Sequence, residues 1–209
     1  AVRRGLSGLR YIARLTDGES GHVLWNHALD LPHPFTESLL FDLVSGLVAS
    51  LGARIENAEQ RRVLAKRKED LDVADLIWLG RWHYHCFTPD GMSTARRLFE
   101  EAVSTRKDSA DAHLNRAWSV LFETWRTRGA PEEIRHGLVL AQEAVRIDPL
   151  DSRAHFLTGA AECWLGNTDR AEEQLRHALD INPSCFHAYG QLGSVLYLDG
   201  RPQEGIEMM

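Results

Sequence analysis

The feature that most constrains the fold is an internal repeat near the end of the sequence. The segment "AHFLTGAAECWLGNTDRAEEQLRHALDINP" at 154–183 aligns with "AYGQLGSVLYLDGRPQEGIEMM" at 188–209. Gly159 then matches Gly193, and Gly166 matches Gly200, each pair being 34 residues apart. A glycine in a helix allows close backbone approach, and Gly followed by Asn predicts a tight turn. The repeat therefore predicts two antiparallel helices that stack on similar neighbours, because one such pair cannot bury its own apolar face.

Two earlier segments fit the same plan less regularly. Ala117 takes the part of Gly159 but lies 42 residues before it, which leaves eight extra residues. We expect these extra residues in "TWRTRGAPEEIRHG", between the two helices of that unit. A still earlier unit begins with "VADLIWLGRWHYHC", in which Gly80 takes the same part. The sequence predicts three complete helical hairpins and most of a fourth over 73–209, the last one truncated.

This pattern resembles the tetratricopeptide repeat, whose period is about 34 residues. The resemblance implies a mainly α fold, an α-solenoid of about four helical hairpins. The sequence departs from the family pattern at some positions, since His155 and Tyr189 stand where the family often has Trp. Bulky Leu175 is expected to fill the space beside the small residues at the helix crossing, and Pro183 ends the second helix because proline cannot continue it.

The family's concave groove implies a set of candidate binding residues on the first helix of each hairpin. The predicted set is Leu114, Trp118, Leu121, Phe122, Arg153, Phe156, Trp164, His187 and Tyr197. An apolar and aromatic set of this kind suits a protein or peptide partner with an apolar or helical segment. The alternative is that these side chains are buried against the next helix of the same chain.

The first part of the sequence has a different pattern. Residues 10–15 alternate in polarity, and turn residues lie at 17–21, which predicts a β-hairpin. "AVRR" is a candidate third strand, and Thr36 is a candidate N-cap for a helix with a broad apolar stripe over 36–55. We expect a small partial α/β segment at 1–57 and a charged linker helix at 58–72, ahead of the repeats at 73–209.

Residues 3–25, together with the following helix, resemble the end of a TolB-like domain. In bacteria such domains recur ahead of tetratricopeptide repeats and behind an adenylate or guanylate cyclase domain or a winged-helix DNA-binding domain. The resemblance implies a non-catalytic regulatory and protein-interaction module of a cytoplasmic, multidomain signalling protein or transcriptional regulator. Any cyclase domain would lie upstream of this segment.

The segment "WHYHC" at 82–86 offers a competing hypothesis, a metal-dependent or Cys/His enzyme centred on 83–86. In a helix, His83 and His85 point about 200° apart, so they cannot share one ion. His83 and Cys86 could share one, but two ligands fall short of the usual four around Zn²⁺. We therefore expect the polar end of a structural helix, with no catalytic residue, metal or cofactor. A small-ligand sensor is a second alternative.

Composition and charge exclude further classes of partner and location. The formal net charge is −6, so the basic face that nucleic acid requires is not expected. Three cysteines without paired spacing fit a reducing compartment. No apolar run is long enough to span a membrane. The last segment, "EGIEMM", stops inside a helical pattern, and "AVRR" would leave an open sheet edge. We expect a homodimer that forms through one of these two ends, with a monomer as the alternative.

Overall fold

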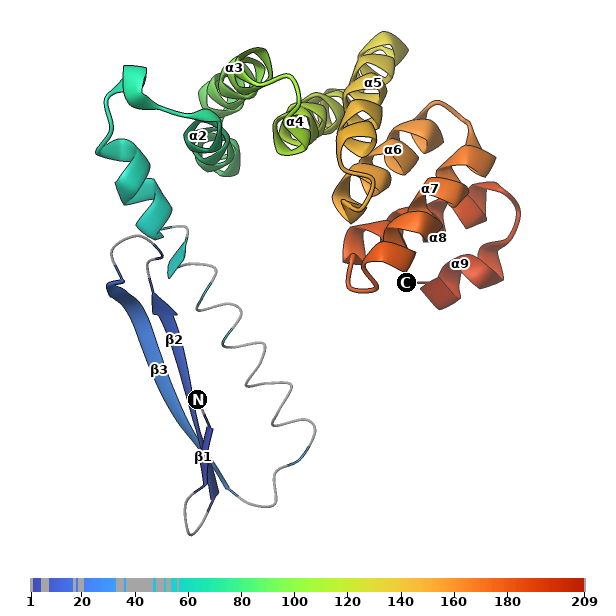
Figure 1. Cartoon of the computed structure of the whole chain (residues 1–209). Helices are drawn as coiled ribbons and strands as arrows, with labels where there is room; N and C mark the ends of the chain where they lie inside the picture. Colours follow the sequence, from blue (N-terminus) through green and yellow to red (C-terminus); the bar gives the residue numbers. More distant parts are fainter. Residues whose placement is uncertain are drawn as a thin grey trace. The chain divides into compact units, whose positions relative to one another are not determined.

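The computed structural model describes residues 2–4, 8–16, 18, 21–32, 36, 47, 51, 54–55 and 57–208. It divides into two compact units, residues 1–67 and 68–209, which are described separately. The first unit contains three strands, and the second contains the helical repeats (Figure 1). The predicted fold class, a mainly helical repeat protein preceded by a small segment with strands, is confirmed.

Three antiparallel strands form the sheet of the first unit, in the order β1-β2-β3. They are β1 (Val2–Arg4), β2 (Gly8–Thr16) and β3 (Val23–Pro32). The β2–β3 register pairs Leu15 with Trp25 and has an irregularity directly after Leu15, next to the turn. The expected hairpin and the third strand at "AVRR" are thus present.

The segment between the sheet and the repeats differs in part from the expected one. Most of the predicted helix at 36–55, with its apolar stripe, lies outside the described residues. The helical stretch at 57–64 stops well before residue 72 and is followed by a turn and the short 3-10 helix η1 (Lys68–Asp70). Asp72 then caps the next helix, so a single linker helix over 58–72 is not formed. The domain bounds at 57 and 72 stay a prediction.

Within its described residues, 68–208, the second unit has eight α-helices that pair into four consecutive hairpins (Figure 1). The helices are α2 (Val73–His85), α3 (Pro89–Thr105), α4 (Ala110–Thr127), α5 (Pro131–Ile147), α6 (Ser152–Trp164), α7 (Thr168–Ile181), α8 (Phe186–Leu198) and α9 (Pro202–Met208). We call α2, α4, α6 and α8 the first helices and the others the second helices. Successive first helices also contact one another, from α2 to α8, so they line one continuous surface.

The helix ends follow from local sequence. At the start of α2, the Asp72 carboxylate accepts a hydrogen bond from the Asp75 amide at 2.9 Å, and the Asp75 carboxylate accepts one from the Asp72 amide at 3.0 Å. This reciprocal pair satisfies two amides that a helix end leaves open. Proline opens α3, α5 and α9, where its missing N–H costs no helical hydrogen bond.

The eight extra residues of the α4–α5 hairpin do not lengthen its loop. Helix α4 has 18 residues against 13 in α6, and α5 has 17 against 14 in α7, which together account for all eight. The extra residues therefore fall almost entirely within the expected segment at 124–137, but they extend the two helices and do not lie between them. Both loops contain three residues, and each has one with positive φ: Arg128 (φ 52°) in one and Gly166 (φ 84°) in the other.

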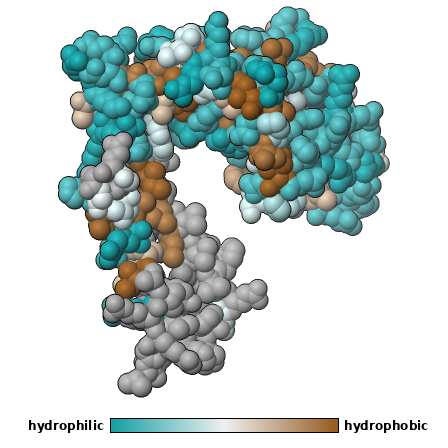
Figure 2. Space-filling view, viewed as in Figure 1, coloured by the Kyte–Doolittle hydropathy of each residue, from teal (hydrophilic) through white to brown (hydrophobic). Residues whose placement is uncertain are grey.

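Small residues hold the helices of each hairpin together at close range. A Cβ placed on Gly159 would lie 2.7 Å from the Cγ of Leu175, so α6 and α7 are in contact through that pair, as the sequence predicted. The same relation joins Gly137 of α5 to Leu121 of α4 and Gly80 of α2 to Phe99 of α3. Buried apolar clusters continue from one hairpin into the next, and hydrophilic surface surrounds a few apolar patches in Figure 2.

Candidate peptide-binding groove

Aromatic rings from three consecutive first helices meet on the surface that these helices share. Trp118 of α4 lies 5.8 Å from Phe156 of α6 and 5.5 Å from His187 of α8, measured between ring centroids. Phe156 and His187 are stacked at 5.5 Å. These spacings are those of favourable aromatic pairs. Because each ring comes from a different hairpin, the cluster exists only when three repeats are stacked in register.

A second aromatic group continues the surface toward α2. The ring of Tyr84 lies 5.7 Å from that of Phe122, which in turn lies 5.8 Å from the ring of Trp125. Trp125 is 60% exposed, whereas burial raises the pKa of the Tyr84 phenol. We call the surface formed by Tyr84, Trp118, Phe122, Phe156 and His187 the inner groove. It encloses a hollow of about 320 Å³, lined by Arg81, Tyr84, His85, Phe87, Phe99, Leu114, Asn115, Trp118, Phe122 and Arg153.

Charged side chains at the inner groove are already bound to one another. The Asp111 carboxylate accepts hydrogen bonds from Arg81 at 3.2 Å and from Arg153 at 3.3 Å. Arg81 also donates to Asn115 at 2.9 Å, and Arg153 donates to Asp151 at 2.7 Å. Burial alone would raise the pKa of Asp151, but the hydrogen bonds and charge of Arg153 hold it below its ordinary value. This network joins α2, α4 and α6 and fixes the orientation of both arginines.

Partial burial lowers the pKa of the His187 imidazole below its ordinary value of 6.5. A neutral imidazole fits the apolar rings of Trp118 and Phe156 better than a charged one, because desolvation disfavours the charged form. The inner groove is therefore mostly uncharged at its centre, with paired charges at one side.

The structure sorts the predicted groove residues into three sets. Trp118, Phe156 and His187 come together in one cluster, with Phe122 and Arg153 lining the adjoining hollow. Leu114 and Leu121 are only 3% and 1% exposed, and both belong to the hydrophobic core, although Leu114 also lines the hollow. Trp164 is partly buried against the core. Tyr197 lies elsewhere, in a separate apolar hollow of about 430 Å³ between α8 and α9.

Sequence reasoning missed the contribution of the first hairpin to this surface. Gly80 and Ala117 occupy the same position of the repeat, so Arg81 stands at the position of Trp118 and His85 at that of Phe122. Extending the same positions back to α2 would have indicated Arg81 and the neighbouring Tyr84. The hydrogen bonds of Asp111 could not have been found in this way, because they join residues that are 30 and 42 positions apart in the sequence.

The segment "WHYHC" forms the end of helix α2, as expected for a structural helix end. Cys86 caps the helix, and its thiol lies 3.4 Å from the Trp82 carbonyl oxygen. Burial, with a smaller effect of Arg97, lowers the pKa of His83. Across the described residues, no group of three or more His, Cys, Asp or Glu side chains could hold a metal ion. Nor does any described helix have the length and apolarity that a membrane span needs.

Stacked helical hairpins with an aromatic surface on their first helices define the fold as a tetratricopeptide-type solenoid. Residues 165–208 match the family model described as "Tetratricopeptide repeat". Among solved structures, TTC0263, a thermophilic tetratricopeptide repeat protein of Thermus thermophilus, aligns with a TM-score of 0.62 at 18% identity, covering 79% of this chain and 84% of that one. MamA aligns with a TM-score of 0.54 at 18% identity, covering 73% and 81%. At this identity the likeness shows the fold alone.

Two curated proteins are similar in sequence. "Putative adenylate cyclase 3" of Rhizobium meliloti (strain 1021) is 25% identical over 175 residues, which are 82% of this chain and 30% of that protein. "Small glutamine-rich tetratricopeptide repeat-containing protein 2" of Saccharomyces cerevisiae is 32% identical over 65 residues, 31% of this chain and 19% of that protein. The chain thus spans less than a third of the length of either relative.

Proposed function

We propose that this chain is a non-catalytic protein-interaction module that binds an apolar segment of a partner protein in the inner groove. The observation that carries the proposal is the ring cluster of Trp118, Phe156 and His187, which three hairpins build together on a partly exposed surface. Large aromatic side chains held rigidly by packing are the usual anchors of a binding surface, because little side-chain entropy is lost when a partner covers them.

The chemistry of the inner groove favours an amphipathic or extended apolar segment as the occupant. Arg81 and Arg153 already share the Asp111 carboxylate, and Arg153 also pairs with Asp151, so the network carries little unmatched charge. Recognition of a strongly acidic peptide would require these pairs to break. An amphipathic helix could instead place apolar residues spaced three or four apart against the successive rings.

The cellular role we propose is regulation of an effector domain in a bacterial signalling protein. Most of this chain aligns with part of a protein named as an adenylate cyclase, which supports a place for it inside a longer cyclase-like chain. The resemblance of residues 3–25 to the end of a TolB-like domain supports the same arrangement, with a cyclase or winged-helix domain upstream. A cytoplasmic location follows from this proposal, as does a partner protein that reports a signal to the effector.

The proposal can be tested with peptides selected for binding from a random library of amphipathic sequences. The combined change Trp118→Ala and Phe156→Ala should weaken binding of the selected peptides by about 2 kcal/mol or more, roughly thirtyfold in Kd, because two aromatic anchors of the inner groove are lost. Fluorescence anisotropy with labelled peptides measures the affinity. In the full-length protein, the same change should also alter the activity of the effector domain.

Val139→Ala provides the matched control, because Val139 is 61% exposed on α5 and does not line the inner groove. Peptide affinity should be unchanged in this variant. Equal affinity for the Trp118→Ala, Phe156→Ala variant and the unmodified chain would show that the peptides bind elsewhere, and the inner groove would then have to be abandoned as the binding site.

A further inference from the structure

One residue that lines the inner groove has a backbone conformation that its side chain disfavours. Phe87 lies in the loop between α2 and α3, and its φ is 51°. In this left-handed region the Cβ atom comes close to the following carbonyl oxygen, so a bulky residue is rarely found there. Among the residues that the structure describes, Arg128 is the only other non-glycine residue with positive φ. The conformation of Phe87 therefore requires an explanation.

The same loop position is a glycine in the two later hairpins α6–α7 and α8–α9. Phe87, Gly166 and Gly200 are each the second of three loop residues. Each donates its amide hydrogen to the carbonyl oxygen three positions earlier, at 3.2, 3.0 and 3.2 Å respectively. The two glycines also have positive φ, 84° and 77°. This loop thus suits glycine, and Phe87 is held in it against its own backbone preference, which is typical of functional sites.

The ring of Phe87 is not part of the hydrophobic core. It is 64% exposed, and its centroid lies 6.2 Å from that of Tyr84. It lines the hollow of about 320 Å³ in the inner groove, which we call the inner hollow. A side chain retained only for packing would be buried, so the exposed ring is better explained as a wall of this hollow.

The inner hollow has the size and the walls of a site for one aromatic ring. A cavity of about 150 Å³ already holds benzene, so about 320 Å³ has room for a ring as large as indole. Most of the walls are aromatic, since five of the lining residues are Tyr84, Phe87, Phe99, Trp118 and Phe122. Rings surrounded by rings make favourable edge and stacked contacts.

The charges of the inner hollow also favour an aromatic occupant. Arg81 and Arg153 line it, and both donate to the Asp111 carboxylate, at 3.2 and 3.3 Å. An acidic side chain would gain little from arginines that are already paired. The face of a neutral aromatic ring carries partial negative charge and attracts a guanidinium group without breaking its ion pair. The charge pattern is therefore complementary to a ring, more than to an aliphatic side chain.

We propose that the inner hollow binds one aromatic side chain of the partner, and that Phe87 determines this specificity. This inference rests on the proposed function, because the inner hollow is part of the inner groove. The partner's ring would lie against Phe87, Tyr84 and Phe122. In the two later hairpins a glycine stands at the position of Phe87 and provides no such wall. The site for the ring is thus built at one repeat only.

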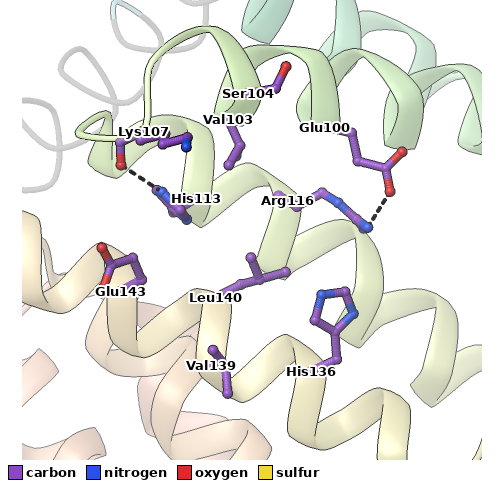
Figure 3. Close-up of a pocket in the computed structure, with 10 residues that line it drawn as sticks. All are labelled: Glu100, Val103, Ser104, Lys107, His113, Arg116, His136, Val139, Leu140 and Glu143. Atoms are coloured by element: carbon purple, nitrogen blue, oxygen red, sulfur yellow. Dashed lines mark hydrogen bonds and ion pairs between the residues drawn. The ribbon is translucent and has the colours of Figure 1, made fainter.

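A second apolar groove is the competing site for such a ring (Figure 3). This outer groove lies between α3 and α5, over α4, has a volume of about 540 Å³ and shares no residue with the inner hollow. Leu140 lies in it between His113, whose Nδ1 has no partner, and Arg116. In the next hairpin Gln174 stands at the position of Leu140, 2.8 Å from Nδ1 of His155. No described Phe, Tyr or Trp lines the outer groove, so a ring would find no ring stacking of this kind there.

The test uses N-acetyl-L-tryptophanamide, a neutral aromatic probe that requires no knowledge of the partner. Titration of the whole chain, followed by NMR through the methyl signals of Leu114 in the inner hollow, should give a Kd of about 1 mM. N-acetyl-L-leucinamide should bind about threefold more weakly, because it offers no ring face to the arginines. The methyl signals of Val103, Val139 and Leu140, in the outer groove, should stay still.

Phe87→Gly separates a binding role from a structural one. Glycine is the residue of the two later loops, so the fold should be kept and the melting temperature should rise by about 2 °C as the strain is relieved. The Kd of the probe should increase about tenfold, because one wall of the inner hollow is lost. Phe87→Tyr is the matched control. It keeps both the ring and the backbone strain, so both values should be unchanged.

Three outcomes would overturn the proposal. Leu114 signals that stay still up to about 20 mM of the probe would show that the inner hollow takes no ring. An unchanged Kd in Phe87→Gly would remove Phe87 from the site. A melting temperature several degrees lower in Phe87→Gly would show that the ring is kept for stability.

Failure of the proposed function would give a different result. Selected peptides that bind equally well to the Trp118→Ala, Phe156→Ala variant would remove the inner groove as a peptide site, whatever the probe does. Peptides that lose affinity in that variant but not in Phe87→Gly would keep the proposed function and reject only the role of Phe87.

Discussion

The two central hairpins, α4–α5 and α6–α7, both pair a glycine with a leucine where their helices cross, but the glycine is on opposite helices. In α6–α7 the glycine is on the first helix, where Gly159 faces Leu175 of the second. In α4–α5 the glycine is on the second helix, where Gly137 faces Leu121 of the first. The repeat therefore requires a small residue opposite a large one at the crossing, and either helix can supply the small one. This exchange explains how a hairpin that departs from the sequence pattern keeps the same architecture.

The two hairpins differ more in their polar contacts than in their apolar ones. The buried histidine of each first helix makes the same hydrogen bond to a backbone carbonyl oxygen at 3.0 Å. Only His155 has a side-chain partner for its second nitrogen. Apolar packing tolerates exchanges of size between neighbours, whereas a hydrogen bond requires a particular atom at a particular distance. A polar difference between repeats therefore changes which hydrogen bonds can form, whereas a difference between core residues can be accommodated by packing.

The largest effect is expected from closing the helix crossing of α6–α7. Gly159→Leu would force a side chain into the space of Leu175, where even a Cβ would lie 2.7 Å from its Cγ, and 3.1 Å from the Ala171 carbonyl oxygen. The free energy of unfolding should fall by about 3 kcal/mol from overpacking. Urea denaturation followed by circular dichroism measures the loss.

Gly190→Ala is the matched control for this substitution. Gly190 lies in α8, and an added Cβ there would meet nothing within 4 Å. Alanine in place of glycine in an open helical position should raise the free energy of unfolding by about 0.5–1 kcal/mol. A Gly159→Leu variant as stable as the unmodified chain would refute the close crossing.

A smaller effect should follow from making the polar contacts of the two hairpins alike. Gln174→Leu removes the partner of the buried His155 nitrogen and should lower the free energy of unfolding by about 1–2 kcal/mol. Leu140→Gln makes the reverse change and should be neutral or slightly stabilising, because His113 gains a partner. Chemical denaturation of both single variants checks the comparison, and equal losses in the two would contradict it.

The smallest effect concerns the pH dependence of the inner groove. The pKa of His187 is lowered by burial in the folded chain, so the unfolded chain binds more protons once the pH falls below about 6.5. The free energy of unfolding should therefore decrease from about pH 7 to about pH 5. His187→Phe should reduce this dependence and keep the ring contacts with Trp118 and Phe156.

The pKa of His83 is lowered in the same direction, so the His187→Phe variant should retain part of the dependence. Urea denaturation at several pH values separates the two contributions, with His83→Gln as the companion variant. A slope in the His187→Phe variant equal to that of the unmodified chain would show that His187 titrates alike in the folded and unfolded states.

Sequence reasoning recovered the contacts that depend on spacing along the chain. The repeat predicted the contact between Gly159 and Leu175 at the helix crossing, and Pro183 correctly ended α7, because both follow from local periodicity. The eight extra residues lie almost entirely in the expected segment, but in the helices and not between them, because helix lengths depend on packing as well as on loop signals. The open nitrogen of His113 also escaped detection, since its missing partner belongs to another helix and depends on the register between helices.

Each hairpin of the second unit contacts mainly its immediate neighbours, so the unit behaves as a one-dimensional array of weakly coupled segments. In such an array, opening can begin at one end and stop partway. The rings of Trp118, Phe156 and His187 belong to three successive segments. A peptide lying across all three would therefore link their opening, and the cooperativity of unfolding should rise when the inner groove is occupied. Binding of a peptide in the inner groove would then make the whole array more rigid, without a change in the contacts within any single hairpin.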